Sequence, residues 1–284
     1  MSFFLEIDEI ISRLKKLRSK ILSIENIRDR KKYAPKEEQI LIELDDIEKL
    51  LWNYSPEELS EDQKGILAGT IYHTSHLAIK MGDLTKLKNA VDKLLKLELP
   101  IFSSRYIIFA NCDIIYELIN CCEYSEAISR FNILKENIGL EKFSTNATQC
   151  GLDLLKSLIE ANLTNESLKI YDGIYSYTNF PSACKHIAEA SFVIIKFFLK
   201  NNNLKEASEI FNKIRKLPIN SETIIFIYKA AISLLCNISS IESAKGKAII
   251  EFLVPEKEDE SLSFLRAKAN YEVIEEYCRN PETY

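Results

Sequence analysis

The chain has 284 residues, of which 46% are hydrophobic and 28% charged, with a formal net charge of −5 at pH 7. This composition excludes a disordered chain, and the acidic balance argues against a general nucleic-acid binder, which is usually basic. No apolar run reaches the roughly 18 residues of a membrane-spanning helix. The start, MSFFLEIDEI, lacks the basic region of a secretory signal. We therefore expect a cytoplasmic protein, with a nuclear location as the alternative.

Glycine and cysteine usage narrows the class of protein further. The chain holds only seven glycines, and its prolines are spread out rather than clustered. This pattern favours helices with short connections and argues against glycine-rich phosphate loops. The seven cysteines include no CxxC pair. We expect them to be small buried residues in a reducing compartment, the adjacent Cys121 and Cys122 included, rather than a redox or metal site.

The first 33 residues carry an apolar pattern at Ile7, Ile10, Leu14, Leu17, Ile21 and Ile24. Spacings of three and four residues are typical of the a/d seam of a coiled coil. One interpretation is a helical hairpin that caps the helices behind it. The other is a seam, over residues 7–24, for a homodimer or a partner helix. Two basic clusters, RLKKLRSK (13–20) and RDRKK (28–32), are interleaved with acids, which favours a solvated helix face over nucleic-acid contact.

From residue 64 onward the chain repeats itself every forty residues. The stretches LTKLKNAVDKL, YSEAISRFNIL, TNESLKIYDGI and LKEASEIFNKI begin at Leu84, Tyr124, Thr164 and Leu204. An apolar column follows at Val91, Phe131, Tyr171 and Phe211, and another at Leu94, Leu134, Ile174 and Ile214.

A second set of helices precedes these, with aligned columns of its own. One column holds Ile114, Leu154, Ile194 and Leu234, and a second holds the small or polar residues Asn111, Gly151, Ser191 and Ala231. One helix hairpin cannot bury its apolar stripe alone, so neighbouring hairpins must stack. The sequence therefore predicts an all-α fold of stacked helix hairpins.

The clearest copy, NNNLKEASEIFNKIRKLP (201–218), has a polar turn, an acid, an alanine, an aromatic residue four positions later and a proline. This signature resembles the tetratricopeptide repeat, over residues 64–255. The resemblance implies antiparallel helix pairs stacked in a right-handed superhelix with a concave peptide-binding groove. The units here have forty residues instead of about 34. Helices about one turn longer fit this difference, and a HEAT-like or other α-hairpin array is the alternative.

The end of the chain departs from the repeat. The last copy slips by one residue, to Ala248 and Phe252, and SLSFLRAKANYEVIEEYC predicts a closing helix over 261–278. The expected organisation is an N-terminal hairpin or coiled-coil-like segment at 1–60, repeats at 61–255 and a capping helix at 256–284.

One face of the first helix in each unit is polar where its other faces are apolar. The resemblance places such a stripe on the concave groove. The predicted partner-binding residues are His73, His76, Lys80, Phe109, Asp113, Tyr116, Asn120, Gln149, Asp153, Lys156, Glu189, Lys196 and Lys229. The same stripe holds Gly69, Glu160, Val193, Lys200 and Ser233. An ordinary wet surface is the other interpretation, and the large side chains of Phe109 and Tyr116 favour a groove.

No arrangement of residues indicates catalysis. His73 and His76 lie one helical turn apart, but no third ligand accompanies them, so they do not predict a metal site. No nucleophile elbow or pair of catalytic carboxylates stands out. We expect neither an enzyme nor a cofactor. The leading hypothesis is a protein–protein interaction scaffold that docks a peptide or helical segment. The alternative is a structural or regulatory subunit that assembles through its N-terminal heptad helix.

Overall fold

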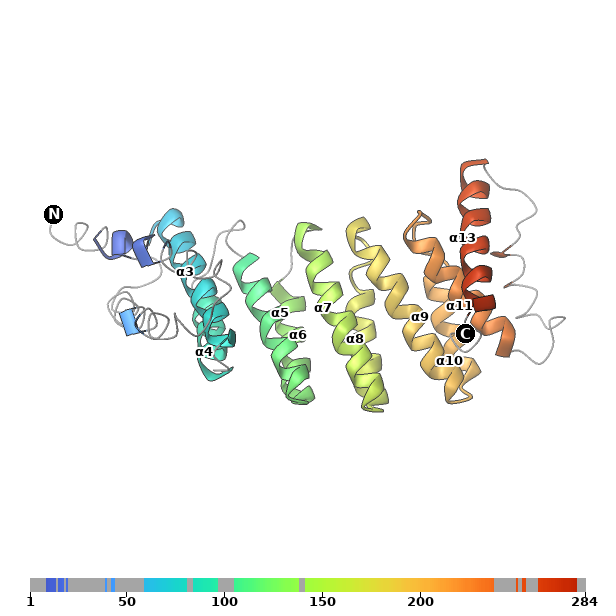
Figure 1. Ribbon diagram of the computed structural model, residues 1–284, viewed down its shortest axis with the longest axis horizontal. Helices are drawn as coiled ribbons and strands as arrows, with labels where there is room; N and C mark the ends of the chain where they lie inside the picture. The colour runs from blue at the N-terminus through green and yellow to red at the C-terminus, as the bar shows by residue number, and fades with distance from the viewer. Residues whose placement is uncertain are drawn as a thin grey trace. The chain divides into compact units, whose positions relative to one another are not determined.

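The computed structural model describes residues 9–13, 15–17, 19, 39, 42, 43, 59–80, 84–96, 105–137, 141–237, 249, 252, 253 and 260–279. Within these residues all regular structure is helical and no strand occurs (Figure 1), which confirms the all-α prediction. The chain divides into two compact units, unit 1 over Met1–Asn137 and unit 2 over Ile138–Tyr284. This boundary falls inside the predicted repeat segment 61–255, whose own limits stay a prediction.

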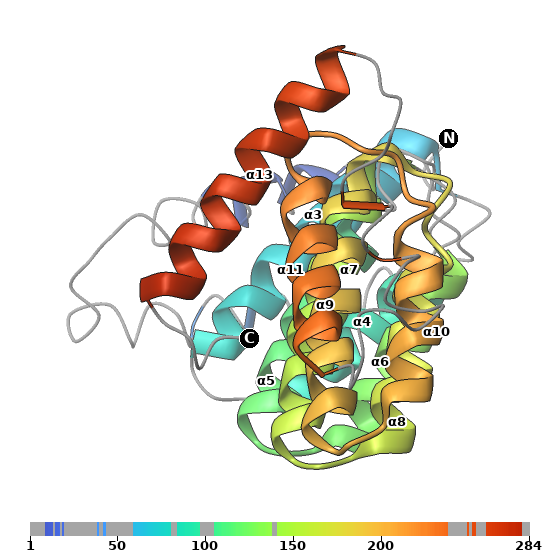
Figure 2. The same ribbon diagram turned by 90° about the vertical axis from the view of Figure 1, so that its right-hand side faces the viewer.

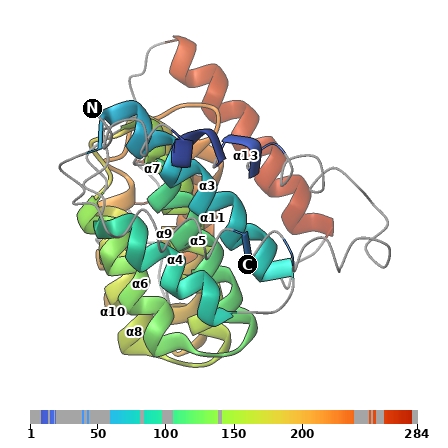
Figure 3. The same cartoon turned by 90° about the vertical axis from the view of Figure 1, so that its left-hand side faces the viewer.

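From residue 59 onward, the described residues of unit 1 form two helix hairpins (Figure 3), which comprise α3 (Glu61–Lys80), α4 (Leu84–Lys96), α5 (Arg105–Asn120) and α6 (Tyr124–Asn137). A capping box starts α3: the Ser60 hydroxyl accepts from the Gln63 amide at 3.3 Å, and the Gln63 side chain accepts from the Ser60 amide at 2.9 Å. Helix α5 contacts both helices of the preceding hairpin. The two hairpins of unit 1 are therefore stacked.

Unit 2 continues the same plan. The elements whose bounds the structure describes there are α7 (Glu141–Glu160), α8 (Thr164–Tyr175), the 3-10 helix η3 (Pro181–Ala183), α9 (Cys184–Lys200), α10 (Leu204–Ile214), α11 (Thr223–Asn237) and α13 (Glu260–Arg279). We call the first helix of each hairpin an A helix (α3, α5, α7, α9, α11) and the second a B helix (α4, α6, α8, α10). Within unit 2, α9 contacts α7 and α11, and the A helices form one layer beside the B helices α8 and α10 (Figure 2).

The B helices begin at the four residues that the repeat predicts, Leu84, Tyr124, Thr164 and Leu204. Three of the turns before them share one backbone conformation, because Cys122, Asn162 and Asn202 have φ angles of 60°, 58° and 57°. Each turn closes its A helix with the paired backbone hydrogen bonds of a Schellman motif, as in Glu123 N to Leu118 O at 2.8 Å and Cys122 N to Ile119 O at 3.0 Å. The left-handed residue therefore recurs every forty residues, as the sequence does.

The apolar columns of the repeat form the core. Val91, Phe131, Tyr171 and Phe211 are buried, as are the residues of the column that begins at Leu94 and the column that begins at Ile114. The small-residue column has a packing role that unit 2 makes visible. The Tyr171 hydroxyl of α8 lies 3.0 Å from the Ser191 Oγ of α9, both fully buried. A small side chain at this A-helix position leaves room for the aromatic ring of the preceding B helix.

The closing helix predicted over 261–278 is confirmed by α13, which packs against α11. Arg266 of α13 donates to the Tyr228 hydroxyl of α11 at 3.3 Å and to the Phe252 carbonyl oxygen. Its guanidinium also lies 4.9 Å from the centre of the Phe252 ring. Phe252 packs edge-on against Phe211 with 5.8 Å between ring centres. These contacts join α13 to α11, and Phe252 to α10.

The cysteines depart from the expectation of burial. Cys112, Cys150 and Cys184 are buried, whereas Cys121, Cys122 and Cys236 are exposed. The exposed ones were predicted wrongly, because they lie at the C-terminal ends of A helices and their turns, where the A and B layers no longer cover side chains.

The N-terminal heptad pattern is only partly within the described residues. Ile10 and Leu17 are buried, at 5% and 0% exposure. The remaining seam positions, Ile7, Leu14, Ile21 and Ile24, lie outside the described residues. The coiled-coil interpretation stays a prediction.

Candidate functional site

The predicted polar stripe of unit 1 is half-buried and partly paired. His73, His76, Phe109, Asp113 and Tyr116 are all intermediate in exposure. The His76 Nδ1 atom lies 3.4 Å from the Asp113 Oδ2 atom and so links α3 to α5. Asn120, at the end of α5, is exposed, and the side chain of Lys80 lies outside the described residues.

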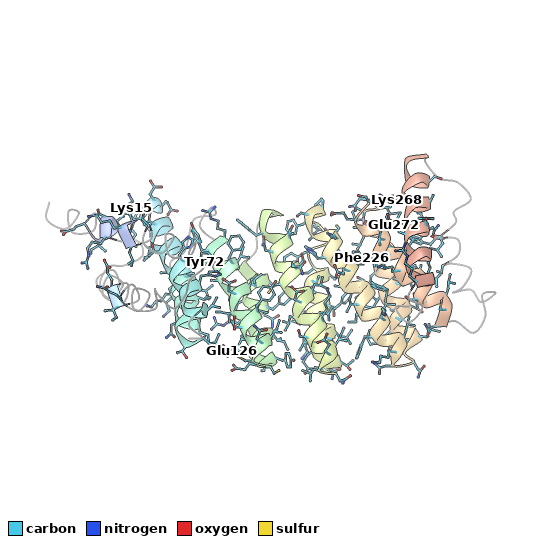
Figure 4. The ribbon with its side chains drawn as sticks, viewed as in Figure 1. Lys15, Tyr72, Glu126, Phe226, Lys268 and Glu272 are labelled. Carbon is cyan, nitrogen blue, oxygen red and sulfur yellow. The ribbon has the colours of Figure 1, made fainter. Side chains whose placement is uncertain are left out.

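An aromatic cluster that sequence reasoning missed accompanies this pair. Tyr72 on α3 (labelled in Figure 4) lies with its ring centre 5.6 Å from that of Tyr106 and 6.1 Å from that of Phe109, both on α5. Arg105 donates to the Tyr106 hydroxyl at 3.1 Å. The available signal was the column one position before the stripe, which holds an aromatic residue at Tyr72 and again, 120 residues later, at Phe192.

The N-terminal part of the stripe in unit 2 is occupied by contacts within the protein. Lys156 of α7 donates to a Glu189 carboxylate oxygen of α9 at 2.8 Å. The Gln149 side-chain amide donates to both Asp153 carboxylate oxygens at 3.1 and 3.2 Å. These four predicted site residues therefore join or stabilise helices α7 and α9.

A histidine beside the stripe also lies at the contact between α7 and α9, which we call the α7–α9 joint. The His186 Nδ1 atom of α9 lies 3.2 Å from the Thr148 hydroxyl of α7. Burial lowers the pKa of His186 below its ordinary value of 6.5, and nearby Lys185 lowers it further, while Glu189, Asp153 and Glu222 oppose the shift. The Thr148 hydroxyl supplies no negative charge to offset the burial. His186 is thus suited to the neutral form.

The C-terminal part of the stripe in unit 2 opens into a groove of about 800 Å³. We call it the A-helix groove, and it runs across the C-terminal ends of α7, α9 and α11. Its lining residues are Ile159, Glu160, Asn162, Phe192, Val193, Lys196, Phe197, Leu199, Lys200, Asn201, Ser233 and Asn237. Five of them, Glu160, Val193, Lys196, Lys200 and Ser233, belong to the stripe drawn from the sequence.

The groove has an apolar floor and a polar rim. Phe192 and Phe197 of α9 are each 8% exposed, and Ile159 and Val193 are half-buried. The Lys196 ammonium lies 5.8 Å from the centre of the Phe192 ring, so it stays at the edge of the floor. The amides of Asn201 and Asn237 each donate to the carbonyl oxygen one turn earlier at 2.9 Å. These bonds hold the ends of α9 and α11 on which the rim depends.

The stripe therefore has two structural roles, which its polarity alone did not separate. Gln149, Asp153, Lys156 and Glu189 make contacts within the protein, and Lys196 lines the groove. Lys229 is half-buried on α11 and is not among the groove residues. The assignment of these residues to partner binding stays a prediction.

The described residues contain no cluster of three or more His, Cys, Asp or Glu side chains placed to hold a metal ion. Among the helices described, none is both long enough and apolar enough to cross a membrane. Comparison with family models, with curated proteins and with solved structures gives no match.

Proposed function

We propose that this chain is a protein-binding helical-repeat module whose A-helix groove docks a segment of a partner protein. The observation that carries the proposal is the groove itself, an apolar floor with a polar rim at the ends of three stacked A helices. The hairpins would continue as the right-handed superhelix that the resemblance to tetratricopeptide repeats implies. The repeat thus supplies a rigid support for a binding surface.

The floor and the rim have different tasks in this proposal. Burying one large apolar side chain of a partner on Phe192, Val193 and Phe197 contributes about 1.5–3 kcal/mol. Rim groups such as Lys196 and Asn162 contribute little energy while exposed, but they fix the register of the bound segment. Binding modules commonly divide affinity and specificity in this way.

The test removes the floor without touching the core. Peptides of about 16 residues selected from a displayed random library against the full chain provide the probes. Val193→Asp should weaken binding of the selected peptides at least about tenfold, because a carboxylate in the floor must be desolvated. Leu168→Asp, at a half-buried position of α8 outside the groove, is the matched control. Far-ultraviolet circular dichroism checks that both variants fold.

Two outcomes would count against the groove. A library that yields no specific peptide would reject a peptide-binding role for the chain. Peptides that bind the Val193→Asp variant as tightly as the original chain would reject the groove as their site. The stripe residues Asp153 and Lys156 are poorer targets for this test, since their substitution also removes the contacts made to Gln149 and Glu189.

A second candidate is assembly through the N-terminal heptad helix. Ile10 and Leu17 are already buried within a single chain, which supports the capping interpretation of that helix over a free seam. We expect light scattering on the full chain to give the mass of a monomer over a wide concentration range. A dimer at low concentration would favour the alternative, a subunit that assembles through residues 7–24.

A further inference from the structure

The charges around the A-helix groove are unequal. Two lysines, Lys196 and Lys200, line it, against one carboxylate, Glu160. On α9 itself, the stripe has one carboxylate, Glu189, which accepts a hydrogen bond from Lys156 of α7 at 2.8 Å. Among the described residues Lys200 makes no ion pair, and it is exposed at the last position of α9. Among the residues that line the groove, positively charged side chains therefore outnumber negatively charged ones.

The two lysines also have a defined spacing. Lys196 and Lys200 are four residues apart on one helix, so they lie on the same face about 6 Å apart along the axis. Phe192 and Val193 lie one turn before Lys196 on α9, which places the floor next to the charges. A complementary ligand needs apolar side chains and, beside them, carboxylates at a similar spacing. An amphipathic helix with acidic residues at i and i+4 satisfies both requirements.

We propose, on the basis of the function proposed above, that the A-helix groove binds an acidic amphipathic helix of a partner protein. Its carboxylates pair with Lys196 and Lys200, and its apolar side chains lie on Phe192, Val193 and Phe197. These carboxylates belong to side chains within the helix, so the bound segment does not have to be the C-terminus of the partner protein. The charge on Glu160 disfavours an acidic residue on the side of the bound helix that faces α7.

The test uses three synthetic peptides of about 14 residues with one apolar stripe in common. Their polar positions carry Glu, Gln or Lys, and both ends are blocked to remove terminal charges. Fluorescence anisotropy with the full chain should show the Glu peptide binding about tenfold tighter than the Gln peptide, as expected for two partly exposed ion pairs. The Lys peptide should bind most weakly, and added salt should reduce the difference.

Charge reversal in the protein completes the test. Lys196→Glu combined with Lys200→Glu should reverse the order of the Glu and Lys peptides. The control pair, Lys169→Glu and Lys205→Glu, changes the net charge equally at exposed positions of the B helices α8 and α10 and should keep the order. An order that the control pair reverses as well would show a response to net charge only and would overturn the assignment to the groove.

The failure of this inference is separable from failure of the proposed function. If the Lys peptide binds as tightly as the Glu peptide, or if none of the three binds, the acidic-helix assignment is wrong. The protein-binding function then still stands wherever library-selected peptides lose affinity for the Val193→Asp variant. If those selected peptides are also unaffected, both proposals fall together.

Discussion

Within each unit, side chains join one B helix to the next at the same spacing along the sequence. The kind of contact differs between the two units. In unit 1, Arg130 of α6 donates to Asp92 of α4 at 2.8 Å, and Lys88 of α4 donates to Glu126 of α6 at 2.6 Å (Figure 4 labels Glu126). The partners are 38 residues apart in both pairs. The hydrogen bond with Glu126 raises the pKa of Lys88, and the nearby carboxylates reinforce this shift against the effect of burial.

In unit 2 the corresponding joint between α8 and α10 is largely aromatic. The Lys213 ammonium of α10 lies 5.6 and 5.4 Å from the ring centres of Tyr171 and Tyr175. The Tyr175 hydroxyl donates to the Lys213 carbonyl oxygen at 3.4 Å, again over 38 residues. Asp172 accepts from the Lys213 ammonium at 3.3 Å. The repeat thus determines which positions meet, while the residues at those positions decide what kind of contact they make.

The largest expected effect comes from the aromatic joint. Tyr171→Ala should lower the free energy of unfolding by about 3–5 kcal/mol, because it leaves a cavity where a fully buried ring packed. Tyr171→Phe should cost only about 1 kcal/mol, since Ser191 keeps its hydrogen bond to the Ile187 carbonyl oxygen. Urea unfolding measures both. A Tyr171→Ala cost as small as that of Tyr171→Phe would show that the ring contributes little to the packing of α8, including its joint with α10.

The charged joint of unit 1 should be weaker and sensitive to salt. Arg130→Met should cost about 1–2 kcal/mol, because Asp92 is half-exposed and solvent screens the pair. This cost should shrink between about 0.05 and about 1 M salt. Lys213→Met in unit 2 should cost about 0.5–1 kcal/mol and depend less on salt, since the methionine side chain still covers the tyrosine rings and the lost pair with Asp172 is exposed. Equal salt dependence in the two variants would contradict the contrast between the joints.

The hairpin turns offer a third comparison, in which the substitution should stabilise the protein instead of destabilising it. Cys122 of unit 1 holds the left-handed conformation that Asn162 and Asn202 hold in unit 2, and asparagine tolerates it better than cysteine. Cys122→Gly should therefore stabilise the protein by about 1 kcal/mol, while Asn162→Gly should change the stability by less than about half of that. Thermal unfolding under reducing conditions compares the two. Equal effects would mean that backbone strain at Cys122 is negligible.

The smallest effect concerns pH and the A-helix joint of unit 2. The pKa of His186 is lowered in the folded chain, so below pH 6.5 the unfolded chain binds its proton first. The stability contributed by neutral His186 is fully present above pH 6.5 and is lost as the pH falls toward the folded-state pKa. His186→Phe, the residue that the repeat has at Phe226, should reduce the loss of stability between about pH 7 and pH 5. Identical pH profiles of the variant and the original chain would rule out this role.

The features that follow directly from the forty-residue repeat were predicted correctly from the sequence. The alignment of Leu84, Tyr124, Thr164 and Leu204 predicted the first residue of the B helices α4, α6, α8 and α10. Before the last three of these helices, a left-handed turn residue recurs at the same period. It also predicted burial at Phe131 and Tyr171. Asp113 and His76 were chosen for polarity, but their mutual contact was not foreseen.

The polar stripe shows where sequence reasoning ends. Polarity marks Lys156 and Lys196 equally, yet Lys156 reaches Glu189 across the α7–α9 joint, whereas Lys196 lies at a groove. The exposure of Cys121 and Cys122 likewise depends on where the layers end. Such outcomes depend on the offset between neighbouring helices, which no single column of the repeat specifies.

The amino-acid sequence by itself determined the described helices, the starts of the B helices and the faces that pack, because apolar columns at a forty-residue period are buried only when neighbouring hairpins stack. The tertiary structure alone decided which polar side chains face one another and which line a hollow. The physical reason is that the two kinds of feature depend on interactions of different range. The spacing of residues on a helix face is set by hydrogen bonds within that helix. A 2.8 Å ion pair or an open groove depends instead on the offset between two neighbouring helices along their axes.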